Sequence, residues 1–503
     1  MLIGSSLLTA CARTLERTLT RPERVAALDR EAKFLKAHML DGRAYVLSEW
    51  AVDGRRNTVF GRGELLDVHR QVVRRDTFTV PLDSVALFET NRVHASPAIA
   101  PLAVVTTASL ALTAYCAANP KACFGSCPTF YVSDGDRSLL QAEGFSASIA
   151  PSLEARDIDA LYRARPDGRD FEVRMTNEAL ETHVLRHVQV LAAPRPSGGR
   201  VFATSNGEFW QADAITEPAL CLAPEGDCRT ALRAFDGVER YSAADSTDLA
   251  ARETIELAFS ATPTGDLGLV IASRQSLLST YVFYQALAYL GRSAGQWLAA
   301  LERGDARARA RAGGISRLLG AIEVQVQDPL GPWVPVGEMQ ETGPLATDVR
   351  LIRLPHPRGD SLRVRLRLAR GNWRLDYVAL ARLGARVEPI RLEPWLVRRG
   401  SVLDEQAQAL LLDSGRVLTT LPGDEYTLVY VLPEDFGRYE LFLDTQGYYL
   451  EWMRGEWLAE EDPARAAMLF LAPEAALRAM APEFKRREAE MERTFWSSRY
   501  VRR

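Results

Sequence analysis

Apolar and polar residues alternate along much of this chain. In the clearest run, 362–368, four aliphatic residues take one face and Arg363, Arg365 and Arg367 take the other. An alternation of period two is typical of strands with one buried face. The chain is therefore expected to have an α+β, mostly β fold, built from several antiparallel β-sandwich or meander units. Shorter runs with the same period lie at 43–50, 77–80 and 322–327.

Two stretches poor in charge predict helices. Residues 102–118 follow a proline, which suits the first turn of a helix, and end before Pro120, which stops one. Such a helix is about 25 Å long, so a buried core helix and a membrane-inserted helix both stay open. In the second segment, 276–303, apolar residues recur every three or four positions. We expect that helix to break near Gly291.

The first eleven residues are uncharged and end in Leu8-Thr9-Ala10-Cys11. This ending resembles the lipobox of bacterial lipoproteins. The resemblance implies that residues 1–10 are a signal segment that is removed, and that Cys11 becomes the lipid-modified first residue of the mature protein. The positively charged start of most secretory signals is missing. An N-terminal helix with a chance cysteine is the other interpretation.

Four of the remaining cysteines form two short-spaced pairs, Cys123 with Cys127 and Cys221 with Cys228. Each pair encloses a turn with a glycine, which can bring two Cα atoms within the roughly 4.4–6.8 Å that a disulfide requires. We expect two local disulfides, which persist in an oxidising compartment. A metal site is the alternative, although zinc sites usually have closer spacing and matching partners. Cys116 lies in the apolar stretch and is expected to be a buried thiol.

A candidate ligand site lies in residues 319–384. The alternating strand 362–368 is followed by a second apolar strand near 372–380, and the pattern resembles galactose-binding-like domains. That fold mostly binds carbohydrate or protein. Guanidinium groups can hold carboxylates or phosphates with two parallel hydrogen bonds, and indole rings can stack on sugars. The plainer interpretation is a solvated sheet face with a tryptophan in the core. The candidate ligand-binding residues are Arg363, Arg365, Arg367, Trp373 and Arg374.

The sequence carries no catalytic signature, so the catalytic residues stay unknown. His183 and His187 have a spacing that places both rings on one face of a helix or strand, but the glutamate of a metalloprotease motif is missing. We expect solvated or hydrogen-bonded histidines there, no metal and no cofactor. The close aspartates Asp157 and Asp159 are expected to serve in turns and caps rather than to bind calcium.

The composition of the chain limits the kinds of partner that it can bind. The chain has 503 residues and a formal net charge of −4, so it lacks the basic footprint of a nucleic-acid-binding protein. Arginine supplies nearly all the basic residues, since lysine occurs only at four positions.

The patterns above divide the chain into six expected segments. They are a signal at 1–10, a hairpin region with the apolar helix at 21–120, a disulfide-stapled β domain at 121–262, a helical segment with a basic linker at 263–318, the β-sandwich at 319–384, and a β region ending in a helix at 385–503.

These observations favour an exported, lipid-anchored protein of the bacterial cell envelope, at the periplasmic or outer-membrane surface, with a non-catalytic binding or scaffolding role. Its expected partners are a membrane, through the lipid anchor, and a glycan or an envelope protein. One alternative is a glycan-active hydrolase that uses paired carboxylates, because such pairs leave no linear motif. The other is an envelope component that inserts residues 102–118 into the membrane.

Overall fold

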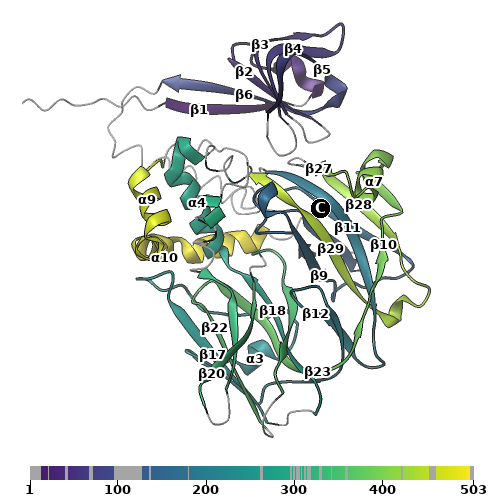
Figure 1. Ribbon diagram of the computed structural model, residues 1–503, viewed down its shortest axis with the longest axis vertical. Coiled ribbons are helices and arrows are strands. Elements are labelled where there is room, and N and C mark those ends of the chain that lie inside the picture. Colours follow the sequence, from purple (N-terminus) through teal and green to yellow (C-terminus); the bar gives the residue numbers. More distant parts are fainter. Residues whose placement is uncertain are drawn as a thin grey trace, which may run out of the picture. The chain divides into compact units, whose positions relative to one another are not determined.

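The computed structural model has a mostly β fold with antiparallel sheets, as the alternation predicts (Figure 1). The described residues form two compact units. One contains the residues up to 95 with short stretches from 287–303 and 452–463, and the other contains the rest. The structure describes residues 13–95, 127–294, 319–451 and 460–498, except for 21, 40–43, 67–71, 135–136, 179–180, 261–263, 328–330, 341–342, 357–360 and 421–422, together with isolated residues between 297 and 313. Cys11, Cys123 and the expected helix 102–118 lie outside these residues.

The first unit is built on one six-stranded sheet, sheet A. Its apolar core includes Leu35, Leu47, Val59 and Phe88, each fully buried. In the order of the sheet the strands are β1 (Arg13–Thr20), β6 (Val85–Ala95), β2 (Phe34–Met39), β3 (Ala44–Asp53), β4 (Thr58–Leu66) and β5 (Val72–Pro81), with the short helices η1 (Pro22–Ala27) and η2 (Leu82–Ser84) between strands.

The second unit contains four sheets, B to E. Sheet B has the order β26 (Val402–Leu403), β25 (Leu396–Arg399), β28 (Glu425–Val431), β10 (Asp170–Thr176), β7 (Thr129–Asp134) and β8 (Arg137–Glu143). Sheet C has the order β24 (Ile390–Leu392), β11 (Glu181–Pro194), β29 (Tyr439–Glu451) and β9 (Ala155–Ala160), with β27 (Leu418–Thr420) also paired to β11.

Sheets D and E follow the same antiparallel plan. Sheet D has the order β12 (Arg200–Ala203), β13 (Phe209–Thr216), β23 (Trp373–Val387), β18 (Leu267–Gln275) and β21 (Asp348–Leu354), with β16 (Arg240–Tyr241) paired to β23. Sheet E has the order β15 (Gly226–Asp227), β14 (Leu220–Ala223), β17 (Arg252–Phe259), β22 (Leu362–Ala369), β19 (Ile322–Gln327) and β20 (Trp333–Met339).

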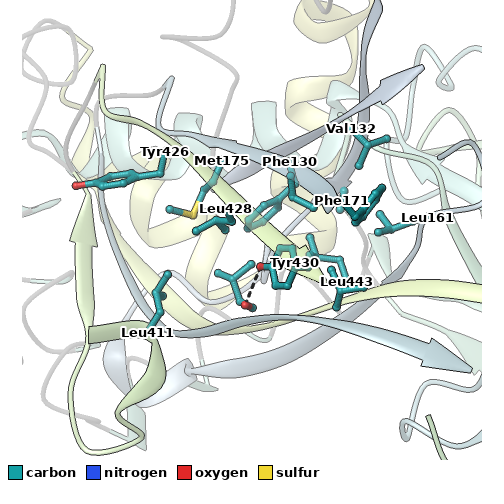
Figure 2. Close-up of a cluster of buried hydrophobic side chains, with 14 of the residues drawn as sticks. Phe130, Val132, Leu161, Phe171, Met175, Leu411, Tyr426, Leu428, Tyr430 and Leu443 are labelled. Atoms are coloured by element: carbon teal, nitrogen blue, oxygen red, sulfur yellow. Dashed lines mark hydrogen bonds between the residues drawn. The ribbon is translucent and has the colours of Figure 1, made fainter. Parts of the chain in front are cut away.

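Three apolar cores stack these sheets in the order B, C, D, E. The first lies between sheets B and C, where Tyr430 donates a 2.9 Å hydrogen bond to the carbonyl of Val188 inside the core (Figure 2). The second, with Phe442 and Val270, joins sheet C to sheet D. The third, with Trp373 and Leu366, lies between sheets D and E. The unit is thus two β-sandwiches that share an interface between sheets C and D.

The sheets combine strands from different expected segments. Sheet B combines β7, β8 and β10, which come before residue 262, with three strands from after residue 385. The strands of 319–384 are divided between sheets D and E and pair with β17 and β18 from the preceding part of the chain. Strands far apart in sequence therefore complete each other's sheets.

Helices are few in the described part of the chain. The expected helix at 276–303 begins as α4 (Leu277–Leu290), and it breaks at Gly291, whose φ of +52° lies in the left-handed region. The charged segment 22–39 forms η1 and the strand β2. No described helix is long and apolar enough to cross a membrane. The remaining helices are η3 (Pro151–Leu153), α3 (Arg229–Leu232), η4 (Gly291–Ser293), α7 (Glu405–Leu412), η5 (Phe436–Arg438), α9 (Pro463–Leu471) and α10 (Pro473–Ser498).

Candidate functional site

The three arginines of β22 lie together on the outer face of sheet E. Leu362, Val364, Leu366 and Leu368 alternate with them and fill the core between sheets D and E. Arg363 pairs with Glu256 of β17 at 2.9 Å, and Arg367 pairs with Glu323 of β19 at 3.4 Å. The period-two pattern is responsible for this row, since every second side chain of a strand points to the same face.

Arg365, at the centre of the row, differs from its neighbours. It donates hydrogen bonds to the side-chain oxygen of Gln325, with Nε at 2.8 Å, so this partner is a neutral amide. Its guanidinium carbon also lies 4.6 Å from the ring centroid of Trp333 on β20, and that of Arg363 lies 5.6 Å from the same ring. Cations above an indole ring are attracted by its electron-rich face. We call Arg363, Arg365, Arg367 and Trp333 the arginine–tryptophan face.

Trp373 and Arg374, the other two expected ligand-binding residues, do not lie on this face. Both belong to β23 of sheet D. Trp373 is fully buried between sheets D and E and donates to the carbonyl of Gly320. Arg374 lies above the ring of Tyr241, at 3.9 Å, and donates at 2.8 Å to Glu492 of α10. The turn before Trp373 carries the chain into the opposite sheet, so closeness in sequence does not bring these residues to the arginine row.

The expected disulfide between Cys221 and Cys228 is formed. The two Cα atoms are 5.2 Å apart, and the loop between them joins β14 to β15 at the edge of sheet E. Cys127 is buried, and the bond that we expect it to form with Cys123 involves a residue outside those that the structure describes. The backbone of Cys127 has a φ of +71° and its N–H donates to Glu181 at 3.2 Å, so this residue is fixed within a buried polar cluster.

The two histidines of β11 lie on opposite faces of sheet C, although an unbroken strand would place them on one. The pairing with β29 shifts register between Leu185 and His187, and this β-bulge reverses the alternation. His183 is fully buried beside Glu181, at 3.4 Å, and burial lowers its pKa to about 3. His187 contacts Asp444 at 3.2 Å. Within the described residues, no group of three or more His, Cys, Asp or Glu side chains could hold a metal ion.

An ionisable cluster lies inside the second unit, where β9 of sheet C meets β21 of sheet D. Asp157 and Asp159 lie on β9, where we expected turn and cap residues, and Asp348 and Arg350 lie on β21 of the facing sheet. Glu143, at the end of β8, is also fully buried and accepts a 2.7 Å hydrogen bond from the N–H of Leu345. Sequence reasoning missed this cluster because about 200 residues separate its halves. The Asp-x-Asp spacing on an alternating strand was the available signal.

Comparison with known proteins gives no further assignment. No protein-family model, no curated protein and no solved structure matches this chain.

Proposed function

We propose that the protein is an exported envelope lipoprotein, anchored through Cys11, whose arginine–tryptophan face binds a carboxylated glycan without catalysing a reaction. The Cys221–Cys228 disulfide supports export, because disulfides persist in oxidising compartments and are rare in the cytosol. The lipobox at 8–11 supports a lipid anchor.

The observation that carries the binding role is the environment of Arg365. Its guanidinium is hydrogen-bonded to an amide, and a carboxylate can replace that amide with a stronger, charge-assisted and bidentate pair. The indole of Trp333 beside it offers an apolar surface against which a sugar ring can pack. Arg363 and Arg367 already have carboxylate partners, so the face suits a single acidic group better than a dense polyanion.

Binding is tested on the detergent-solubilised full chain with oligosaccharides of hexuronic acid, and with uncharged hexose oligosaccharides of the same length. We expect the acidic sugars to bind and Arg365→Gln to weaken this binding at least about tenfold, the usual scale for loss of a buried or charge-assisted hydrogen bond. Arg386→Gln is the control, since Arg386 is a surface arginine of sheet D, outside the arginine–tryptophan face, that is held by Glu208 and has a side chain 52% exposed. Equal binding of acidic and neutral sugars, or equal loss in both variants, contradicts the proposal.

The anchor is tested separately by labelling cells with a palmitate analogue. The wild-type protein should take up the label and Cys11→Ser should not. A wild-type protein without label contradicts the anchor, whatever the outcome of the glycan experiment. Release of shortened sugars during the binding assay would instead favour the glycan hydrolase.

A further inference from the structure

The interface between the two β-sandwiches contains more buried acid than base. Arg350 on β21 pairs with Asp157 of the facing strand β9 at 2.9 Å and with Asp348 of its own strand at 2.8 Å. Asp159, two residues along β9, is buried beside them. Glu143 is buried close to Asp157 and Asp159 and interacts electrostatically with both. The cluster therefore contains one guanidinium, which interacts with Asp157, Asp159 and Asp348, and a fourth carboxyl group, that of Glu143.

Three carboxyl oxygens of this cluster are fully enclosed and make no hydrogen bond among the described residues: Oδ2 of Asp159, Oε1 of Glu143 and Oδ1 of Asp348. Of these, only Oδ1 of Asp348 has the positive charge of Arg350 beside it. An ionised carboxylate that is buried and unpartnered is strongly disfavoured, whereas the protonated form carries no net charge. Like charges confined in one site also prevent each other from ionising. The geometry thus favours protons on part of this cluster.

The surrounding charges do not supply the missing positive charge. Arg156 of β9 is bonded through both nitrogens to Asp444 of β29, each at 2.7 Å. Arg200 of β12 is bonded in the same way to Glu440, at 2.8 and 3.2 Å. The other titratable groups that face the cluster from neighbouring strands are Glu181 and His187 of β11 and Tyr162 after β9.

We propose that this cluster makes the C–D interface sensitive to pH: its protonated form holds the two sandwiches together, and loss of its protons in alkaline medium loosens the contact between β9 and β21. An exported protein is exposed to the pH outside the cytoplasm. The proposal concerns the contact between β9 and β21, so it goes beyond the glycan face and does not depend on glycan binding.

The direction of titration agrees with this geometry. Burial raises the pKa of Glu143 to about 8, although the N–H groups of Leu345 and Ala346 oppose the shift. Burial also raises the pKa of Asp348 to about 7, against the opposing effect of Arg350, and that of Asp159 well above its usual range. A carboxyl group with a raised pKa in the folded state stabilises the fold fully below its unfolded pKa, near 4. That contribution is lost as the pH rises through about 7 to 8.

The experiment measures hydrogen exchange of β9 and β21 in the full chain at pH 6 and pH 9, corrected for the intrinsic effect of pH on exchange. We expect protection of these strands to fall more than about tenfold at pH 9, since one unit of pKa difference corresponds to a factor of 10. Sheet A is the internal reference, where protection should change little.

Three variants test whether the buried acids cause the loss of protection at pH 9. Asp159→Asn and Glu143→Gln imitate the protonated acids, and each should reduce the loss of protection at pH 9. Either one suffices if the other does not fold. Asp213→Asn is the matched control, because Asp213 is an exposed aspartate of sheet D paired with Arg382, and it should behave as the wild type. The proposal is overturned if wild-type protection is the same at both pH values, or if the folded acid-mimicking variants lose as much as the wild type.

Discussion

Strands β22 and β9 carry the same type of pattern but lie in opposite environments. On β22 the charged residues alternate with aliphatic ones and face outward from sheet E, where each contacts partners on neighbouring strands. On β9 Asp157 and Asp159 also share one face, but these side chains are enclosed: Asp157 pairs with Arg350 of β21, and Asp159 is buried. Alternation therefore identifies the two faces of a strand and leaves open what covers each of them.

This difference predicts that a buried arginine contributes more to the free energy of unfolding than an arginine on the surface. Arg350→Ala removes the cation between Asp157 and Asp348 and leaves buried carboxylates unpaired, which typically costs about 3–5 kcal/mol. We expect a decrease of that size in the free energy of unfolding, measured by denaturant titration at pH 7. Arg386→Ala, a surface control, should cost less than about 1 kcal/mol. Equal effects of the two substitutions would mean that the enclosed ion pairs of Arg350 contribute no more to stability than a surface ion pair.

The edge of sheet E provides an intermediate effect. Replacing both Cys221 and Cys228 by serine opens a loop with a sequence separation of 7 residues, for which chain entropy predicts a loss of about 2–3 kcal/mol. The loss should be visible in thermal unfolding and should disappear when both proteins are measured under reducing conditions. A loss that persists in reducing medium would mean that packing of the cysteines, rather than the bond, is responsible.

The smallest effect on stability is expected on the arginine–tryptophan face. Arg363→Ala and Arg367→Ala each remove one exposed ion pair, which contributes about 0–1 kcal/mol. Thermal unfolding should therefore change little in either variant, while Arg365→Gln impairs glycan binding. A loss of several kcal/mol from Arg363→Ala would show that the row supports the sandwich rather than a ligand.

The sequence predicted much of the secondary structure because strand alternation and glycine breaks are local properties. The row of Arg363, Arg365 and Arg367, the break at Gly291 and the Cys221–Cys228 bond were all found in this way.

The rest depended on contacts that local patterns do not contain. Trp373 was assigned to the ligand site because it follows β22 closely, yet its strand enters the other sheet. Trp333 lies beside the arginines because β20 is their neighbour through β19. Asp159 and Asp348 meet only when the two sandwiches pack, and the bulge that separates His183 from His187 is visible only in the pairing of β11 with β29.

Arginine-specific footprinting with phenylglyoxal tests the central contrast most directly, in the full chain with and without hexuronate oligosaccharide. The account predicts that Arg365 is modified in the free protein and protected by the sugar, while Arg350 resists modification in both states because it is buried and paired with Asp157 and Asp348. Modification of Arg365 that the bound sugar leaves unchanged, or ready modification of Arg350 in the folded protein, would contradict it.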